Sequence, residues 1–147
     1  MIIPSSIQSI DHLTTTMWEI EQMAAELRKG SNVQSSLSIS TQELLDVNGV
    51  HELDSTVANT LVKQLTAIKS SAKQVHVSTG SMATFEWRNR ITKWLRSEID
   101  EHLFCSFSSN ISQGGGVVLR TPKNAYSLVY KDKILTNSPT IARLLPS

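Results

Sequence analysis

The first thirty residues carry apolar side chains at spacings of three and four residues. They begin with Ile3 and continue as Ile10, Leu13, Met17, Ile20, Ala24 and Leu27. Because an α-helix turns once every ~3.6 residues, this spacing places the side chains on one stripe of a single helix. Lys29 and Gly30 predict its end, since a cation suits the last turn and glycine tolerates a positive φ just beyond it.

This apolar stripe permits two interpretations. Ile10, Leu13, Met17 and Ile20 either pack on the helix's own domain or form a seam that binds a partner helix. A coiled-coil seam is normally recognised from ~3 to 4 heptads, and the stripe covers about two and a half. The spacing alone leaves both alternatives open, so these four residues are candidate partner-binding positions.

A polar, serine-rich segment from Ser31 to Ser40 follows, and it is typical of a linker. Ser40-Thr41-Gln42-Glu43 then has the spacing of a capping box, in which the serine oxygen accepts from a backbone N–H three residues on. It predicts the start of a short helix that ends at Asn48-Gly49. The apolar residues of this helix are Leu44, Leu45 and Val47.

Another helix is predicted to begin at Asp54 or Ser55, because both residue types are favoured N-caps. It ends in the polar stretch Lys69 to Lys73. Its apolar face consists of Val57, Leu61, Leu65 and Ile68. We therefore divide the chain into an amphipathic helix over residues 1–30, a linker and helical segment over 31–73, and a small α+β domain over 74–147.

From residue 74 on, the pattern predicts a strand, a helix and a second strand. The alternation of Val75 and Val77 with polar residues predicts the first strand, and Leu103 to Phe107 the second. The helix between them buries its apolar residues, which are Phe85, Ile91, Trp94, Leu95 and Ile99. Its outward face is expected to carry the cations Arg88, Arg90, Lys93 and Arg96.

A hairpin and a last helix complete the predicted domain. The glycines Gly114 to Gly116 lead into a third strand, Val117 to Arg120, and a turn leads into a fourth, Tyr126 to Tyr130. Ser138-Pro139 predicts the start of a final helix. Its apolar residues are Ile141, Leu144 and Leu145. The chain is thus expected to be α+β, an N-terminal helical segment followed by a β-α-β-β-β-α domain.

Composition narrows the class of protein. A chain of 147 residues with 39% hydrophobic residues suits one compact unit, or one domain with a helical extension. The net charge of +1 gives no global field that would favour nucleic acid as a partner. No apolar run approaches the ~18 to 20 residues of a membrane helix, and the first ten residues lack a signal-peptide pattern. A soluble, cytoplasmic protein without direct membrane insertion is expected.

Residues that carry chemistry are few and scattered. The four histidines fall in four predicted elements without metal-binding spacing. The single cysteine, Cys105, lies on an apparent core strand. The turn Thr79-Gly80-Ser81 precedes a helix but lacks the lysine and glycine spacing of a phosphate loop, so capping is its expected role. The sequence therefore predicts no catalytic residue, no cofactor and no metal.

The basic helix is the remaining candidate surface. Arg88 to Arg96 contains four cations, with Trp87 and Trp94 among them. Interleaved arginine and aromatic residues can bind single-stranded nucleic acid. The same arrangement also suits an acidic protein partner or a solvated face over a tryptophan core. A small α+β nucleic-acid-binding module is therefore an alternative function.

Two features of the second half are informative: the order of its elements and the segment Ile111-Ser112-Gln113-Gly114-Gly115-Gly116-Val117-Val118-Leu119-Arg120. Together they resemble the C-terminal domain of the delta subunit of F-type ATP synthases, called OSCP in mitochondria. In that family a strand, a helix and a strand precede an Ile-Gly-Gly signature. A strand with an exposed basic residue, a return strand and a terminal helix follow it. Residues from about 44 to 145 follow this order.

The chain departs from the family in two respects. Ser109-Asn110 and Tyr126-Ser127 stand where the family usually has an Asp-Pro before the signature and an aspartate in the return strand. The N-terminal helical bundle of typical members is mostly missing, since only about seventy residues precede Val75. The resemblance is therefore to a divergent member with a reduced N-terminal domain.

The resemblance implies a non-catalytic stator subunit. Such a subunit connects the catalytic head, through an alpha subunit, to the membrane-anchored b subunits of the peripheral stalk during proton-coupled ATP synthesis. It would lie at the inner face of the cell membrane, held there by the complex and without direct nucleic-acid contact. In the C-terminal domain, the candidate partner-binding residues are Gly114, Gly115, Arg120, Ile141, Leu144 and Leu145.

Overall fold

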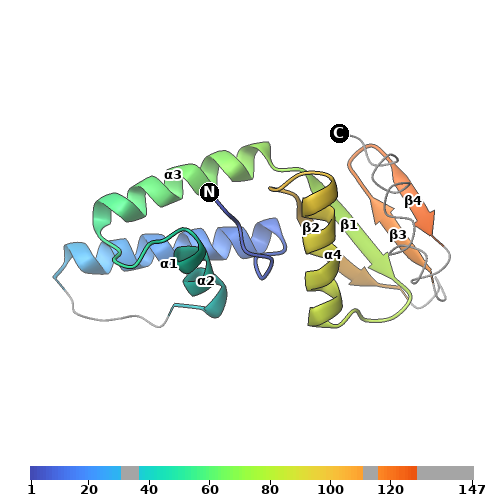
Figure 1. Ribbon diagram of the computed structural model, residues 1–147, viewed down its shortest axis with the longest axis horizontal. Helices are drawn as coiled ribbons and strands as arrows, with labels where there is room; N and C mark the ends of the chain where they lie inside the picture. The colour runs from blue at the N-terminus through green and yellow to red at the C-terminus, as the bar shows by residue number, and fades with distance from the viewer. Residues whose placement is uncertain (31–36, 111–115, 129–147) are drawn as a thin grey trace. The chain divides into compact units, whose positions relative to one another are not determined.

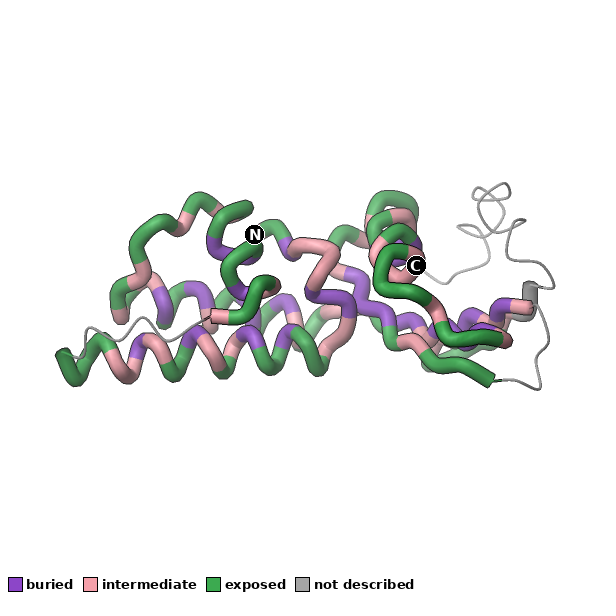
Figure 2. Tube along the Cα trace, turned by 90° about the horizontal axis from the view of Figure 1, so that it is seen from below, coloured by how far each residue is buried: buried purple, intermediate pink, exposed green. Residues whose placement is uncertain are grey.

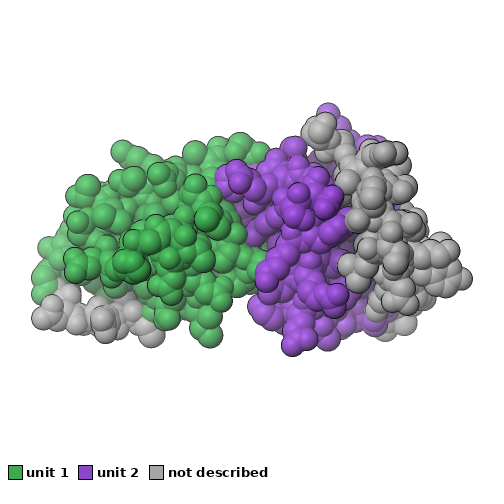
Figure 3. All heavy atoms as spheres, viewed as in Figure 1, with its two compact units in different colours: residues 1–71 green, residues 72–147 purple. Residues whose placement is uncertain are grey.

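A computed structural model describes residues 1–30, 37–110 and 116–128, and it divides the chain into two compact units (Figures 1 and 3). Unit 1 spans Met1–Ser71 and its described elements are helices. Unit 2 spans Ala72–Ser147 and contains a four-stranded mixed sheet with a helix. The predicted α+β class, with helices at the N-terminus, is confirmed.

Helix α1 (Ile10–Arg28) has the bounds that the apolar stripe predicts. The side chain of Ser9 caps its N-terminus by accepting a hydrogen bond from the backbone N–H of His12 at 3.2 Å. Lys29 is the C-cap, and Gly30 follows with a φ of 72°. Figure 2 shows the buried positions of α1 recurring along the helix, and they are Leu13, Thr16, Ile20 and Ala24.

Helix α2 spans Ile39–Val47. The prediction that Ser40 caps this helix is wrong, because the helix begins two residues earlier than a cap at Ser40 would allow. Its N-cap is Ser38, whose side chain accepts from the backbone N–H of Thr41. The carboxylate of Glu43 does not turn back to the helix start, because it accepts a hydrogen bond from the Ser6 hydroxyl at 2.5 Å. The predicted stop is confirmed, with Asn48 as the C-cap.

Helix α3 (Ser55–Ser71) begins after Asp54, whose carboxylate accepts from the backbone N–H of Val57 at 2.7 Å. This agrees with the predicted cap. Helices α1 and α3 lie side by side in unit 1. The segment before α1 adds Ile3 and Ile7 to the buried residues of the unit. The buried residues of α3 are Ala58, Leu61, Leu65 and Ile68.

The sheet of unit 2 has the strand order β2-β1-β3-β4. Strands β1 (Gln74–Thr79) and β2 (Phe104–Ser109) are parallel, and helix α4 (Phe85–Glu98) connects them. Strand β3 (Val117–Arg120) is antiparallel to β1, and β4 (Ala125–Leu128) is antiparallel to β3. The predicted hairpin is therefore present. The predicted helix over residues 138–145 lies outside the described residues.

One face of the sheet packs against α4 and forms the core of unit 2. Alternate strand residues point to this face, as the pleat requires. The core consists of Val75, Val77, Ile91, Leu95, Leu103, Cys105, Val117 and Leu119. The rings of Trp87 and Phe107 border this core, with their centroids 6.2 Å apart in an edge-to-face arrangement.

The predicted division of α4 into an apolar inner side and a basic outer side is partly wrong. Phe85 is 54% exposed. Arg96 is half-buried, since its Nε donates to the carbonyl oxygen of Leu103 at 2.9 Å and its guanidinium lies 5.3 Å from the ring centroid of Phe104. Arg88 is half-buried as well. Arg90 and Lys93 are exposed as predicted.

Candidate functional site

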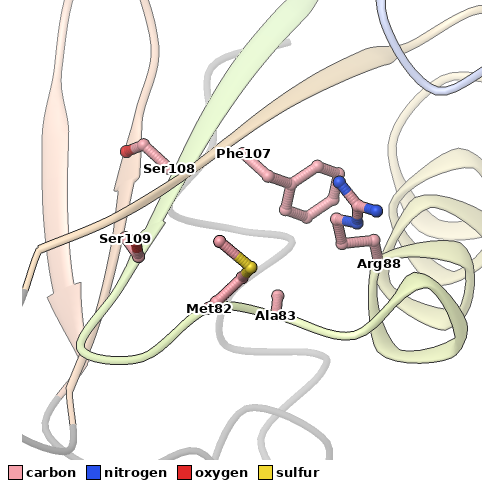
Figure 4. Close-up of a pocket in the computed structure, with 6 residues that line it drawn as sticks. All are labelled: Met82, Ala83, Arg88, Phe107, Ser108 and Ser109. Atoms are coloured by element: carbon pink, nitrogen blue, oxygen red, sulfur yellow. The ribbon is translucent and has the colours of Figure 1, made fainter.

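A hollow of about 250 Å³ lies where β1 and β2 end and α4 begins (Figure 4). Its lining consists of Met82, Ala83, Arg88, Phe107, Ser108 and Ser109. A second hollow, of about 290 Å³, shares Met82 and Ala83 with it. In sheets with parallel strands, ligands usually bind at this carboxyl edge. The two hollows are therefore the candidate small-molecule site of unit 2.

Local hydrogen bonds shape the turn that borders both hollows. The Thr79 hydroxyl donates to the carbonyl oxygen of Ser81. Thr84 is the N-cap of α4, and its side chain accepts from the backbone N–H of Trp87 at 3.2 Å. The capping role expected at this helix start is thus performed by Thr84 rather than by Thr79-Gly80-Ser81.

The polar groups around the 250 Å³ hollow do not converge on one point. In Figure 4 the guanidinium of Arg88 lies beside the ring of Phe107, on the side away from Ser108 and Ser109. The Nε of Arg88 is buried without a hydrogen-bond partner. The side chain of Met82, which borders the hollow, is 86% exposed. The hollow thus offers an apolar contact surface next to one cation, and not the convergent polar set that orients a small substrate.

A second polar group of residues lies on the other face of the sheet. His76 alternates with the core residues Val75 and Val77, so its side chain points away from α4. Its Nδ1 lies 2.6 Å from the hydroxyl oxygen of Ser106, and its Nε2 lies 2.8 Å from that of Ser108. This group is not evident from the sequence alone, because it depends on the register between β1 and β2.

The predicted partner-binding residues of α1 do not share one environment. Leu13 and Ile20 are fully buried within unit 1, so they are core residues and cannot form a seam for a partner. Ile10 and Met17 are half-buried. The apolar stripe therefore packs on its own unit, which corrects the partner-seam alternative for Leu13 and Ile20.

In the C-terminal domain, Arg120 is exposed at the end of β3. The remaining candidates, Gly114, Gly115, Ile141, Leu144 and Leu145, lie outside the described residues. The structure therefore brings no two of the predicted C-terminal candidates together within its described part.

Besides Arg96, whose pKa is lowered by burial, Cys105 and Asp100 of unit 2 have pKa values shifted by their surroundings. Burial raises the pKa of the Cys105 thiol to about 11, while a hydrogen bond with Thr92 and the charge of Arg96 oppose this rise. The pKa of Asp100 is lowered, first by a hydrogen bond from the backbone N–H of His102 and also by Lys73, whose Nζ lies 3.3 Å from the carboxylate. Both groups have structural partners, and neither lines the hollows described above.

Over the described ranges, no cluster of three His, Cys, Asp or Glu residues is arranged to hold a metal ion. Across the same ranges, none of the helices is both long and apolar enough to cross a membrane. Comparison of the chain with family models, with curated proteins and with solved structures finds no match.

Proposed function

We propose that the protein is a non-catalytic subunit of the delta (OSCP-like) type, which links the catalytic head of an F-type ATP synthase to the b subunits of its peripheral stalk. One observation carries the proposal: the order β1, α4, β2, β3 and β4 in unit 2, with the glycine segment directly before β3. The exposed Arg120 on β3 stands where the resemblance places an exposed basic residue.

Exposed apolar residues near the start of α4 support the proposal that this protein binds other proteins. Met82 and Phe85 are large apolar residues that are 86% and 54% exposed, and both lie near the start of α4. Exposed apolar residues grouped in this way are common where proteins bind other proteins. The hollow beside Met82 lacks convergent polar groups, which suits an interaction surface better than a catalytic cleft.

Unit 1 bears on the contact with the catalytic head. Its described helices are α1, α2 and α3, and α1 packs against both of the others. An alpha subunit of the head would therefore bind an outer surface of this unit. Trp18 is the best candidate there, because it is a large apolar side chain on α1 with 58% of its surface exposed.

The nucleic-acid alternative loses support from the geometry of α4. It required four cations on one outward face, and Arg88 and Arg96 are half-buried against their own unit. Arg90 and Lys93 remain as exposed cations of the helix. Two cations on one helix give a weak phosphate-binding surface, since affinity for nucleic acid grows with the number of phosphates neutralised.

A binding experiment with the soluble part of the b subunit from the same organism tests the proposal. The full chain should be retained by the immobilised b subunit, and deletion of residues 138–147 should abolish retention while circular dichroism shows that the rest stays folded. Lys93→Glu is the matched control, because Lys93 is exposed on α4 and should leave retention unchanged. If the folded full chain binds neither the b subunit nor the isolated catalytic head, the proposal is wrong.

The same preparation separates the two candidate functions. The nucleic-acid alternative predicts binding to a single-stranded oligonucleotide that weakens steeply as the salt concentration rises. The stator proposal predicts no such binding at physiological salt. Oligonucleotide binding that is lost in the Arg90→Glu and Lys93→Glu variants would favour the alternative.

A further inference from the structure

We propose that His76, Ser106, Ser108 and Arg120 form a site for a phosphate group on the sheet face opposite α4, and that His76 takes up a proton when the anion binds. The ligand is either inorganic phosphate or a small phosphate monoester, because the chemistry of recognition is the same. This site does not depend on the stator proposal, since it takes another class of ligand and shares only Arg120 with the residues that the stator proposal uses.

Strand register brings the four residues together. His76 pairs with Ser106 across the parallel strands β1 and β2, and with Arg120 across the antiparallel strands β1 and β3. Residues that pair directly across a sheet point to the same face, with Cβ atoms ~5 Å apart. Ser106 and Ser108 are two residues apart on β2, so they share this face at a spacing of ~7 Å. His76 on β1 therefore lies between the two serines of β2 on one side and Arg120 of β3 on the other, with all four residues on the same face of the sheet.

The imidazole of His76 is within hydrogen-bonding distance of both serine hydroxyls. The protonation state of the ring determines the direction in which the hydroxyl hydrogens point. Its two ring nitrogens are 2.6 Å and 2.8 Å from the hydroxyl oxygens of Ser106 and Ser108. In the neutral ring one nitrogen accepts, so one serine must donate its hydrogen to the ring. In the protonated ring both nitrogens donate, so both serines become acceptors toward it. Both hydroxyl hydrogens are then free to point outward.

Outward-pointing hydroxyls and a guanidinium on the same face of a sheet are the donors that a phosphate oxyanion requires. Ser106, Ser108 and Arg120 are exposed, so an anion from solvent can reach them. The guanidinium of Arg120 can make paired hydrogen bonds to phosphate oxygens, and such charge-assisted bonds are the strong ones. Protonated His76 adds a second positive charge beneath the anion. Proton uptake and anion binding therefore favour each other.

The charges on this face support an anion and oppose a cation. The other strand positions on this face carry uncharged residue types, and they are Gln74, Ser78, Phe104, Val118, Ala125 and Ser127. The turn between β3 and β4 contributes Lys123, which is exposed. Helix α4, with Glu86 and Glu98, packs on the opposite face, and its Arg96 is the residue whose guanidinium lies 5.3 Å from the ring centroid of Phe104. A bound phosphate would place its negative charge between the protonated imidazole of His76 and the guanidinium of Arg120, and would interact favourably with both.

Nuclear magnetic resonance of the His76 ring tests the inference on the full chain. The pH at which the ring signals change is measured in sodium phosphate, in phosphoserine and in sodium chloride at equal ionic strength. We expect this pH to be higher by at least half a unit in one or both phosphate ligands than in chloride. A higher value with phosphoserine than with inorganic phosphate would identify the monoester as the ligand. Equal values in all three solutions would overturn the proposal.

Variants distinguish a specific site from general attraction to a basic surface. Arg120→Gln keeps a hydrogen-bonding side chain but removes the charge, and it should weaken phosphate binding about tenfold. Lys123→Gln removes a nearby exposed cation and should change the affinity less than twofold. His76→Gln should remove the pH dependence of binding between pH 5 and 8. If Lys123→Gln weakens binding as much as Arg120→Gln does, the phosphate is only an adventitious ion and the site is refuted.

Discussion

Arg96 and Lys93 are both cations of α4, yet their side chains have different surroundings. The guanidinium of Arg96 lies over the ring of Phe104 and donates to the Leu103 carbonyl, and burial lowers its pKa. Lys93 is exposed to solvent. An arginine can cover apolar surface with its stem and stack its planar head on a ring. Arg96 therefore contributes to the packing of unit 2 and is not available to bind a partner's phosphates.

Cys105 gives a prediction at the scale of one residue. Burial raises the pKa of its thiol to about 11, so at pH 8 the native protein holds very little thiolate. Because thiolate is the reactive form, labelling by a disulfide reagent at pH 8 should be at least ~100-fold slower in the native protein than in urea. Rapid labelling of the native protein would contradict the buried position of Cys105.

The same thiol links stability to alkaline pH. In the folded chain the pKa is about 11, so the unfolded chain loses this proton first as the pH rises. The contribution of Cys105 to the free energy of unfolding is therefore complete at neutral pH. It is lost as the pH rises toward the pKa of the thiol in the folded chain. The rise of the Cys105 pKa from its ordinary value to about 11 corresponds to ~3 kcal/mol of stability. Urea denaturation of wild-type and Cys105→Ala proteins should show a steeper alkaline loss in the wild type.

At the scale of an element, α2 is held at its start by a residue of α1. The Oε2 of Glu19 accepts from the backbone N–H and the hydroxyl of Ser38, at 3.1 and 2.9 Å, and from the Thr41 hydroxyl at 2.5 Å. A carboxylate at a helix N-terminus also interacts favourably with the helix dipole. The beginning of α2 is thus fixed by a contact from a residue 19 positions earlier in the chain than Ser38.

Removal of this carboxylate should destabilise unit 1. Glu19→Ala leaves the backbone N–H of Ser38 and the buried Thr41 hydroxyl with fewer partners. We expect a loss of ~1 to 3 kcal/mol in the free energy of unfolding, measured by urea denaturation. Glu21→Ala, at an exposed position of the same helix, should change it by less than ~0.5 kcal/mol. Equal effects of the two variants would show that the Glu19 contacts contribute nothing.

The sequence predicted those element boundaries that depend on local chemistry. Lys29 and Gly30 end α1, and Asp54 caps α3, because each acts on backbone groups within a few residues. The start of α2 was misplaced because the Ser40 capping box fits the local pattern as well as Ser38 does. The carboxylate that favours Ser38 comes from Glu19 on another helix, and no local rule includes it.

The burial of side chains on α4 and the register of the strands in unit 2 were less predictable from the sequence than the helix boundaries. The spacing of residues on α4 gives the direction of each side chain but not how far its neighbours cover it. Phe85 was therefore expected to be buried, and Arg88 and Arg96 to be exposed. The group formed by His76, Ser106 and Ser108 requires the pairing of strands 30 residues apart. Two short alternating patterns do not determine their own register, so this group could not be derived from the sequence.

At the scale of the whole molecule, each unit has buried residues of its own. Unit 1 is built around residues such as Leu13, Ile20 and Leu65, and unit 2 around Val77 and Leu95. A loss of packing in one core therefore acts first on the residues of the same unit. Units of this kind commonly open as separate cooperative regions.

Hydrogen exchange on the full chain should reveal this independence. Ile20→Ala leaves a cavity in unit 1 and should cost ~2 to 5 kcal/mol, so amide exchange in α1 and α3 should become faster. The amides of β1 and β3 should keep their protection. Leu95→Ala should have the reverse effect, because Leu95 is fully buried in the core of unit 2. Trp18→Ala is the matched control on α1, since its side chain is 58% exposed and should change exchange in neither unit. If each core variant accelerates exchange in both units to the same extent, the two units unfold together and the predicted independence is wrong.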